Sequence, residues 1–442
     1  HHWNGKLMPE AVAVIDPMIP DSKYPSKNLC GAGLALKLVQ GVSMKLGVPH
    51  SYEDYLDLAA LATVADIVDL NGENRIITKY GIRKIMKHPC VGIQALLKAS
   101  GSRRNKMDSY GLSFLLAPRI NAAGRMGDAK CAVRLFTTDD ATEAEKIALL
   151  LNESNTKRKE IQEEIFQSAV KIIESDAGYK NDMVTVVWGH GWHHGVIGIV
   201  ASKLVELYHK PAFVFSVDDD KAVGSGRSIE GFNLFDAMES QSDLLIKFGG
   251  HEQAGGLTLM AQDLELFRKR VNEYARGFIN KEMLVPALAV DFEVTPEDIC
   301  LKNAKMISML EPFGCGNPNP IFCFRGAVIL NKKPVGNGKH LKLTFGIGDK
   351  TVDAVYFGKG TLDGGIATGD RVDIVFTLEV NCWNNTAYLQ LKVCDMRLER
   401  AALERNRFLL DVARRVECLD YDENWLYNGI IDKKINIDDI EA

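Results

Sequence analysis

The spacing of apolar residues divides the chain into a helical first part, a mixed middle part and a strand-rich last part. Apolar positions recur every three to four residues in three early segments, which predicts helices at residues 33–46, 52–68 and 74–87. A short run at residues 11–15 has the pattern of a strand. We therefore expect the first part to belong to an α/β domain.

One helical stripe continues over residues 141–173 and is interrupted in its middle by Asn152, Asn155 and Arg158. A helix of this length whose apolar face is broken halfway is better explained as a connector between two lobes than as a core helix. The alternative is a helix that packs on one domain only.

The middle part alternates strands and helices and holds three glycine-rich clusters with basic residues. We expect a strand at residues 184–188 and helices at residues 196–208, 234–246 and 264–280. The three clusters are Gly191-Trp192-His193-His194-Gly195, Gly224-Ser225-Gly226-Arg227-Ser228 and Gly249-Gly250-His251.

These clusters have the composition of a phosphate site. Glycine lets the backbone approach an anion closely, Arg and His add donors, and the amides at a helix start favour negative charge. A single such cluster is more often an ordinary turn, but three within one α/β segment favour bound phosphate. The predicted phosphate-binding residues here are His193, His194, Gly226, Arg227, Ser228, Gly249, Gly250 and His251.

A second basic constellation spans residues 118–127, where Arg119 and Arg125 frame small residues and Asn121. Either arginine can clamp a phosphate through two parallel hydrogen bonds. A loop with an ordinary surface ion pair explains these residues equally well, so both interpretations stay open.

The last part alternates apolar and polar residues, with glycine turns between the alternating runs, which predicts a small β-barrel. Basic and aromatic residues accompany these runs, the combination with which such barrels bind single-stranded nucleic acid. The alternative is that the aromatic rings fill the barrel core. The residues are Lys339, His340, Lys342, Tyr356, Trp383, Asn384 and Tyr388, of which Lys339, His340, Lys342 and Trp383 are the candidate DNA contacts.

The composition limits the class of protein. A chain of 442 residues exceeds one ordinary domain, and 46% hydrophobic with 25% charged residues is typical of a folded, soluble chain. The net charge of −5 excludes a uniformly basic surface, so a nucleic-acid site has to be local. Nine cysteines without a C-x-x-C pair predict buried, reduced thiols and a cytoplasmic location. No apolar run reaches the ~20 residues of a membrane span.

Two features bear on metal binding. Asp66 lies in the apolar run of residues 58–68, where a carboxylate needs a cation or a metal ion as its partner. The chain opens with His1-His2, and imidazole together with carboxylate suits a divalent ion such as manganese, although two side-chain types identify no single metal. A residual tag would also explain the two histidines.

Taken together, these segments resemble the RecJ family, single-stranded-DNA-specific exonucleases of the DHH phosphoesterase superfamily. The resemblance runs from His1 to about Arg397 and rests on motifs that follow one another in the family's order, which disfavours a tag. The motifs are His1-His2, Met8-Pro9, Ala13-Val14-Ile15-Asp16-Pro17, Gly31-Ala32-Gly33, Ala62-Thr63-Val64-Ala65-Asp66, Pro118-Arg119-Ile120-Asn121-Ala122-Ala123-Gly124-Arg125, Trp192-His193-His194-Gly195-Val196-Ile197-Gly198, Gly224-Ser225-Gly226-Arg227-Ser228, Phe248-Gly249-Gly250-His251 and Leu310-Glu311-Pro312-Phe313-Gly314-Cys315-Gly316-Asn317-Pro318.

The resemblance implies an α/β, multidomain fold. It makes residues 1–136 the C-terminal part of a DHH phosphoesterase α/β domain, residues 137–175 a long connector helix, and residues 176–284 a DHH-associated α/β domain that binds phosphate or DNA. It makes residues 285–398 an OB-type β-barrel that binds nucleic acid and residues 399–442 a helical and acidic extension.

The resemblance also implies an activity. It implies a monomeric exodeoxyribonuclease that trims single-stranded DNA from 5′ to 3′ by two-metal hydrolysis in DNA repair and recombination, with manganese or magnesium as cofactor and other DNA repair proteins as further partners. By position, His1 resembles a metal ligand, His2 the catalytic, phosphate-facing histidine, and Asp66 a catalytic aspartate that also binds metal.

One departure from the family pattern limits this expectation. The aspartate that precedes the histidine pair in the family, and an upstream Asp-x-Asp, are not in the sequence. We therefore expect the C-terminal portion of a longer reading frame, which binds single-stranded DNA weakly and cleaves it poorly or not at all.

Two rival functions remain. One is a phosphodiesterase for oligonucleotides or cyclic dinucleotides, which would need neither barrel nor connector. The other is a non-catalytic DNA-binding replication scaffold, against which His1, His2 and Asp66 argue.

Overall fold

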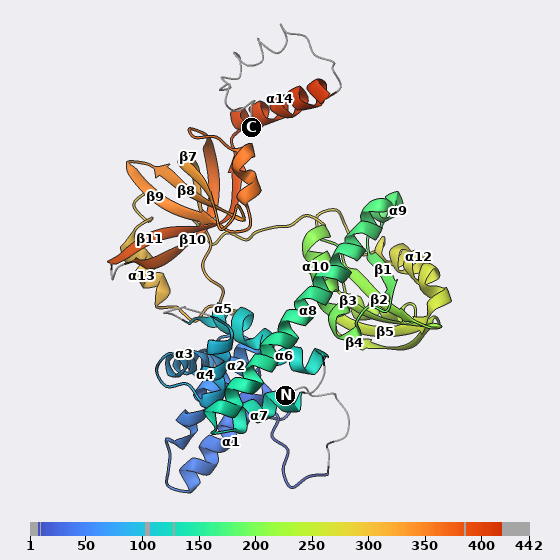
Figure 1. The fold of residues 1–442 in the computed structure, drawn as a ribbon, viewed down its shortest axis with the longest axis vertical. Helices are drawn as coiled ribbons and strands as arrows, with labels where there is room; N and C mark the ends of the chain where they lie inside the picture. Colours follow the sequence, from blue (N-terminus) through green and yellow to red (C-terminus); the bar gives the residue numbers. More distant parts are fainter. Residues whose placement is uncertain (1–7, 9, 102–106, 127–128, 384–385, 418–442) are drawn as a thin grey trace. The chain divides into compact units, whose positions relative to one another are not determined.

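The computed structural model describes residues 8, 10–101, 107–126, 129–383 and 386–417. It divides into two compact units, His1–Ala287 and Leu288–Ala442, and each is described by itself (Figure 1). The first unit combines a helical part with a mixed sheet, and the second is built on a barrel.

The first part of the first unit consists of helices in the described residues. The helices predicted at residues 33–46 and 74–87 are confirmed, whereas the one predicted at residues 52–68 begins as a 3-10 turn and ends three residues early, at Ala65. The strand predicted at residues 11–15 is wrong, because this run pairs with no strand in the described ranges and Val12 is fully exposed. A run of apolar residues forms a strand only where a neighbouring strand makes hydrogen bonds with its backbone N–H and C=O groups. The helices are α1 (Gly31–Lys45), η1 (Ser51–Tyr55), α2 (Leu56–Ala65), α3 (Gly72–Lys87), α4 (Val91–Ala99), α5 (Ser109–Gly111), η2 (Leu112–Leu116), α6 (Ala117–Met126) and α7 (Lys130–Thr137).

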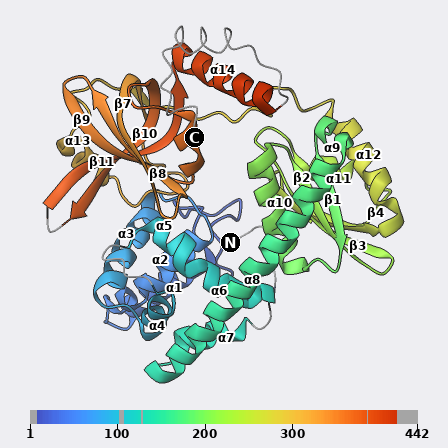
Figure 2. The same ribbon diagram turned by 45° about the horizontal axis from the view of Figure 1, so that its top comes forward.

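The long helix α8 (Ala141–Ser175) packs against both parts of the first unit (Figure 2). Its first half contributes Ala144 and Leu151 to the core of the helical part. Its second half contributes Ile165 and Ile173 to the core beneath the sheet. The prediction of a connector helix is therefore confirmed.

The second part of the first unit is a five-stranded sheet in the order β1-β2-β3-β5-β4. Strands β1 and β2 run parallel, and the other neighbours run antiparallel. Helices α8 and α10 pack on one face, while α11 and α12 pack on the other, against Phe213 and Phe215 (Figure 1). The elements are α9 (Ala177–Asn181), β1 (Thr185–His190), α10 (His194–Tyr208), β2 (Ala212–Asp218), β3 (Lys221–Arg227), α11 (Leu234–Glu239), β4 (Leu245–Gly250), β5 (Ala254–Met260), η3 (Ala261–Asp263) and α12 (Leu264–Ala275).

Two helix predictions in this part extend too far. Helix α12 ends at Ala275 rather than at residue 280, and α11 ends at Glu239 rather than at residue 246. Residues Leu245–Gly250 instead form β4, because pairing with β5 overrides the local helical spacing. Gly249 and Gly250 thus lie within a strand and do not follow a helix.

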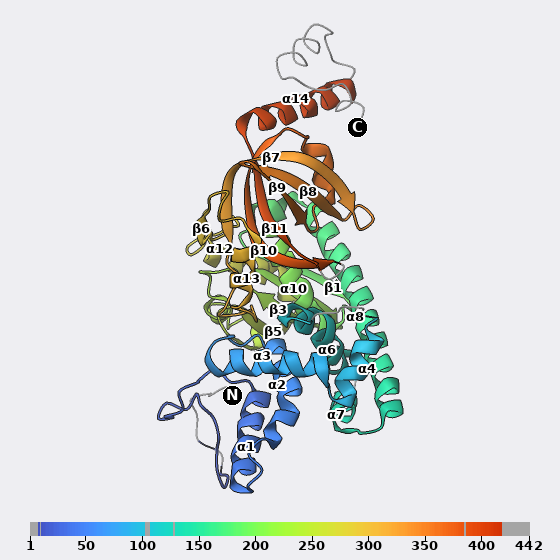
Figure 3. The same ribbon diagram turned by 90° about the vertical axis from the view of Figure 1, so that its left-hand side faces the viewer.

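The second unit is built on a closed five-stranded barrel (Figure 3). The sheet order is β10-β11-β9-β8-β7-β6, and the pairing of β10 with β7 closes the barrel. Alternate residues of β8 fill the core, where Leu341, Leu343 and Phe345 are fully buried, so the predicted barrel is confirmed. The elements are β6 (Phe292–Glu293), α13 (Leu301–Ser308), β7 (Phe322–Val335), β8 (His340–Ile347), β9 (Lys350–Tyr356), η4 (Gly360–Gly365), β10 (Arg371–Trp383), β11 (Thr386–Leu398) and α14 (Arg400–Glu417).

Tyr356 is a core residue of this barrel. Its side chain is buried, and its hydroxyl donates a hydrogen bond to Asp395 Oδ1 at 3.2 Å. Burial, with the negative charge of Asp395 added, raises the pKa of Tyr356 to about 12. Lys339 lies in the turn before β8, whereas the side chain of Trp383 and all of Asn384 lie outside the described residues.

Two observations concern the cellular setting. In the described ranges, no helix combines the length and hydrophobicity that a membrane span requires. The cysteines in the same ranges carry free thiols, but among them only Cys30 is buried, and Cys315 and Cys382 are exposed, so the predicted burial is wrong for most of them.

Candidate phosphate-binding site

Helix α10 begins directly after the first glycine-rich cluster, and His193 is its N-cap. The Nδ1 atom of His193 accepts a hydrogen bond from the backbone N–H of Gly195 at 3.1 Å. Because Nδ1 is the acceptor, the neutral ring carries its proton on Nε2, which leaves one N–H donor for a ligand. Gly191, with φ of +67°, makes the left-handed turn that leads from β1 to the helix.

Arg227 of β3 lies against the first turns of α10. Its Nη1 atom donates to the Gly226 carbonyl oxygen at 2.7 Å and to Ser225 Oγ at 3.2 Å, so the guanidinium folds back along its own strand. A Cβ atom at Gly198 would lie 2.9 Å from Ser225 Oγ and 3.2 Å from Arg227 Nη2. Glycine at position 198 therefore lets the strand bring a guanidinium close to the helix start.

Arg125 of α6 contacts the same helix start. Its Nη1 atom donates to the Gly195 carbonyl oxygen at 3.0 Å. A Cβ atom at Gly195 would overlap the carbonyl oxygen of Arg125. Because α6 packs closely on α10, the exposed guanidinium of Arg125, which belongs to the helical part, contacts the sheet part.

Arg158 of α8 supplies a third guanidinium, and it is only 9% exposed. Its Nη1 atom donates to Gln162 Oε1 at 2.9 Å, and its Nη2 atom donates to Asn155 Oδ1 at 3.2 Å. Its buried Nε atom has no hydrogen-bond partner among the described residues. A buried guanidinium that is held by neutral amides and keeps an unused N–H is suited to receive an anion.

Arg125, Arg158 and Arg227 form what we term the guanidinium cluster. Burial lowers the pKa of Arg158 and of Arg227, and the positive charge of Arg125 lowers both further. All hydrogen bonds from the three side chains to described residues end on neutral carbonyl, amide or hydroxyl oxygens. A bound anion would relieve this repulsion and complete the hydrogen bonds.

The sheet face that carries Ser225 continues as bare backbone. Ser225 pairs with Gly256, and Gly256 pairs with Gly249. Both glycines are exposed, and a Cβ atom at Gly249 would meet nothing within 4 Å. Lys247 is exposed two residues earlier on β4, so exposed glycine backbone and a cation lie on the same sheet face as Ser225, which bonds to Arg227. Such a surface suits a sugar-phosphate chain.

The glycines of the second cluster have a different role from the one expected. Gly224 and Gly226 lie inside β3, which pairs on both sides, so their backbone groups belong to the sheet. A Cβ atom at Gly226 would lie 2.6 Å from the Phe213 ring, and one at Gly224 would overlap the ring of Phe215. These positions are therefore glycine because phenylalanine rings cross the strand, and neither glycine turns the chain toward an anion.

The other predicted residues of this part take varied positions. His194, the first residue of α10, pairs through Nε2 with Asp218 Oδ2 at 2.8 Å. Ser228 is buried and its Oγ atom donates to the Phe232 carbonyl oxygen at 2.6 Å. His251 is exposed in the turn between β4 and β5.

The structure separates the two arginines of residues 118–127. Arg119 is buried, and it donates to Asn152 Oδ1 at 3.0 Å and to the carbonyl oxygen of Leu115. Asn121 is exposed on α6. Residues 118–126 belong to helix α6 and not to a loop, and of the two arginines only Arg125 joins the guanidinium cluster.

The expected burial of Asp66 is wrong. Helix α2 ends at Ala65, and Asp66 is exposed at its C-cap, so this carboxylate lies outside the apolar core. His1 and His2 lie outside the described residues. Within the described ranges, no three His, Cys, Asp or Glu side chains gather as a metal ion would require. Of the residues predicted to bind metal or to act in catalysis, the structure therefore describes Asp66 alone.

Arg158 was not predicted as a site residue, although the sequence carries a signal for it. Three polar residues interrupt the apolar stripe of α8, and the structure buries two of them, Asn155 and Arg158, with Gln162. Buried polar groups in a helix require partners or a ligand, so an interrupted stripe can mark a site.

On the barrel, an exposed aromatic ring lies among basic side chains. Phe357, directly after β9, is 53% exposed. Its ring centroid is 5.2 Å from that of His340, and Lys392 Nζ lies 5.9 Å from its centroid. An exposed ring beside cations suits base stacking. Lys342, by contrast, pairs with Asp353 at 3.2 Å.

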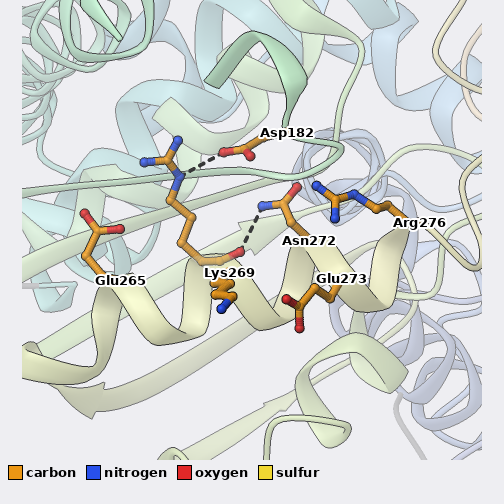
Figure 4. A pocket seen from close by; sticks show the side chains of 7 residues that line it. Asp182, Glu265, Lys269, Asn272, Glu273 and Arg276 are labelled. Atoms are coloured by element: carbon orange, nitrogen blue, oxygen red, sulfur yellow. Dashed lines mark hydrogen bonds and ion pairs between the residues drawn. The ribbon is translucent and has the colours of Figure 1, made fainter. Parts of the chain in front are cut away.

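A polar pocket beside α12 serves the fold (Figure 4). Arg268 Nε donates to Asp182 Oδ2 at 2.8 Å, and Asn272 Oδ1 accepts the backbone N–H groups of Met183 and Val184 at 2.7 and 2.9 Å. Because these groups hold β1 to α12, we assign no ligand to this pocket.

Two family models match the parts that carry these features. The DHHA1 domain matches residues 180–277, which include α10 and the sheet. The RecJ OB domain matches residues 290–395, which include the barrel.

Curated relatives extend the match over most of the chain. The single-stranded-DNA-specific exonuclease RecJ of Bacillus subtilis (strain 168) is 37% identical over 398 residues, which are 89% of this chain and 50% of that protein. RecJ of Salmonella typhimurium (strain LT2) is 32% identical over 419 residues, which are 90% of this chain and 72% of that protein. The chain belongs to the RecJ family. It spans half the length of the first of these relatives.

Solved RecJ structures have the same architecture. The crystal structure of RecJ from Thermus thermophilus in complex with Mn²⁺ matches with a TM-score of 0.76 at 31% identity, over 90% of this chain and 57% of that one. The complex of the same protein with Mg²⁺ matches with a TM-score of 0.72 over 86% of this chain. The predicted fold class, with an OB-type barrel, is thereby confirmed. In this RecJ fold the guanidinium cluster lies where the DHHA1 domain meets α8.

Proposed function

We propose that this chain holds single-stranded DNA in a RecJ-type exonuclease, and that the whole protein trims such DNA from 5′ to 3′ in DNA repair and recombination. The observation that carries the proposal is the guanidinium cluster at the start of α10, whose described partners are all neutral. The 5′-terminal phosphate of a DNA strand supplies the matching charge. The printed names of the relatives support DNA as the source of that phosphate.

The proposed contacts differ in kind. Arg125, Arg158 and Arg227 donate charge-assisted hydrogen bonds to the phosphate, and His193 donates from Nε2. The backbone at Gly249 and Gly250 lets the following sugar-phosphate chain approach, with His251 beside it. Asn121 and His194 stay predicted contacts, while Arg119, Gly226 and Ser228 support the backbone of the site through their own packing.

The barrel provides a second contact with the strand. Phe357 stacks on a base while His340 and Lys392 lie beside it. Lys339, Lys342 and Trp383 stay predicted DNA contacts. The contact tolerates any sequence, because every base has a face on which a ring can stack.

Manganese or magnesium is the proposed cofactor, because the Thermus thermophilus RecJ structures hold these ions. When bound, such ions activate a water molecule and stabilise the leaving oxygen. His1 and Asp66 are the proposed metal ligands, and His2 and Asp66 the proposed catalytic residues. A cytoplasmic location, a monomeric state and other DNA repair proteins as partners also stay predictions.

The test is the affinity of the chain for 5′-phosphorylated single-stranded DNA across a salt series. Affinity should fall steeply with salt, and Arg227→Ala should weaken it and reduce the log–log slope by roughly 0.7 for each phosphate that the variant no longer neutralises. Arg270→Ala is the matched control, because Arg270 is partly exposed on α12 and pairs with Asp243 at 2.7 Å. The proposal fails if Arg227→Ala and Arg270→Ala bind alike.

A further inference from the structure

A cavity of about 350 Å³ lies between α8 and the loop that precedes α10. This volume lies within the range of ~300–1,000 Å³ that small-ligand sites occupy. The contacts described above for phosphate use only one of its lining residues, His193. The lining residues are Ile161, Glu164, Ile165, Gly191, Trp192 and His193.

Two glycines place Trp192 in the wall of this cavity. A Cβ atom at Gly189 would overlap the indole ring, so the ring lies across the end of β1. Gly191 makes the left-handed turn, with φ of +67°, that brings the indole back over the strand. Trp192 nevertheless stays partly exposed at the edge of the core shared by α8 and α10. The local backbone is thus arranged to keep an indole at the cavity.

The charge of the cavity differs from that of the guanidinium cluster. Its titratable lining groups are Glu164, which is exposed, and His193, whose Nδ1 atom already caps α10. A carboxylate repels phosphate, but it accepts hydrogen bonds from the amino and imino groups of a nucleobase. Ile161 and Ile165 add apolar contacts for a planar ring. The lining therefore suits a base and not a second phosphate.

Helix α8 sets the distance between Arg158 of the guanidinium cluster and the cavity. Arg158, Ile161 and Ile165 follow one another at i, i+3 and i+7, so they lie on one stripe of the helix. The cavity accordingly begins about one turn, ~5.4 Å, beyond Arg158. His193 lines the cavity, and it bonds to Gly195, the residue whose carbonyl oxygen accepts from Arg125. A nucleotide with its phosphate on the cluster can place its own base in the cavity.

We propose that this cavity, with Trp192 as its stacking wall, binds the nucleobase of the 5′-terminal nucleotide. The inference rests on the proposed function, because the guanidinium cluster fixes the position of the terminal phosphate. Stacking on Trp192 accepts any base. Glu164 adds a preference for bases with an exocyclic amino group over thymine, which has no amino group and offers the carboxylate only its ring N–H.

The test compares two 5′-phosphorylated single strands that differ only in the first nucleotide, which is adenine in one and abasic in the other. We expect the wild-type chain to bind the adenine strand about tenfold or more tightly, since a stacked base typically contributes that much. Trp192→Ala should bind both strands equally, and Trp192→Phe should keep most of the preference. Trp188→Phe is the control that leaves the preference unchanged, because Trp188 packs with the core on the other sheet face.

Equal affinity of the wild-type chain for the two strands overturns the inference while leaving the phosphate site intact. Loss of any advantage of a 5′-phosphate over a 5′-hydroxyl overturns the proposed function, and the inference with it. The comparison on the wild-type chain needs no substitution, so it decides even if Trp192→Ala does not fold.

Discussion

The guanidinium of Arg125 donates a hydrogen bond to the carbonyl oxygen of Gly195 at 3.0 Å, and this contact joins α6 to the first turn of α10. Only glycine fits at position 195, because a Cβ atom would overlap the Arg125 carbonyl oxygen. The contact brings a charge from the helical part to a helix start, where unpaired amides favour anions. The packing of two helices thereby determines the electrostatics of the candidate site.

Gly195→Ala should therefore weaken both the fold and DNA binding. We expect the free energy of unfolding to fall by ~1–3 kcal/mol, as in other overpacked sites, and the affinity for single-stranded DNA to fall with it. Urea denaturation and a DNA titration measure the two effects. Gly124→Ala on α6 is the control, because its Cβ atom would meet nothing within 4 Å. A Gly195→Ala variant with wild-type stability and affinity would contradict this account.

Substitutions of Gly226 and Gly249 should have different effects, the first on the free energy of unfolding and the second on the affinity for DNA. Gly226→Ala places a Cβ atom 2.6 Å from the Phe213 ring, so it should lower the free energy of unfolding by ~1–3 kcal/mol. Adding Phe213→Leu should restore part of the stability. Gly249→Ala points into open space, so it should leave stability unchanged and weaken DNA binding. Urea denaturation and a DNA titration again measure the two effects. Weaker DNA binding with normal stability for Gly226→Ala, together with lower stability for Gly249→Ala, would contradict these roles of the two glycines.

Tyr356 should make the barrel less stable at alkaline pH. Burial, followed by the charge of Asp395, raises its pKa from the ordinary value of 10.0 to about 12. Because the folded state keeps the proton longer than the unfolded state, the stabilisation is fully present below pH 10 and disappears between about pH 10 and 12. Urea denaturation across this range should show a steeper decline for the wild type than for Tyr356→Phe. Parallel declines would refute the linkage.

Phe357→Ala should weaken binding of single-stranded DNA to the barrel. Removal of one stacking ring typically costs ~1–3 kcal/mol, and thermal stability should change little because Phe357 is 53% exposed. Phe292→Ala is the matched control, since Phe292 is 68% exposed on β6. Affinities from fluorescence anisotropy compare the two variants. Equal decreases in affinity for Phe357→Ala and Phe292→Ala would contradict the proposal that Phe357 stacks on a DNA base.

The elements that the sequence predicted correctly are those whose pattern is complete within one segment. The helices α1 and α10 and the alternating strand β8 each carry their own periodicity. The elements that were predicted wrongly depend on whether a neighbouring strand pairs with them. Residues 245–250 are a strand because β5 pairs with them, and residues 11–15 are not a strand because no described strand does.

The candidate site was only partly predictable for the same reason. His193 and Arg227 stood out because their motifs are local. Gly226 was misread because the ring that requires it, Phe213, belongs to the neighbouring strand. Arg158 was missed because its significance arises from the proximity of Arg125, which comes from another helix. Packing between segments that lie far apart in the sequence brings Arg125 and Arg158 together, and the spacing of apolar residues within one segment does not predict such packing.

Arg158 offers the most direct test of the phosphate assignment, because it is buried, held by two amides and close to a second positive charge. The measurement is the ratio of dissociation constants for strands with a 5′-hydroxyl and a 5′-phosphate. The wild-type chain should prefer the 5′-phosphate by about tenfold or more, as charge-assisted hydrogen bonds allow. Arg158→Gln should reduce the ratio to near one, and Arg270→Gln should not. A wild-type preference that survives Arg158→Gln would contradict the account.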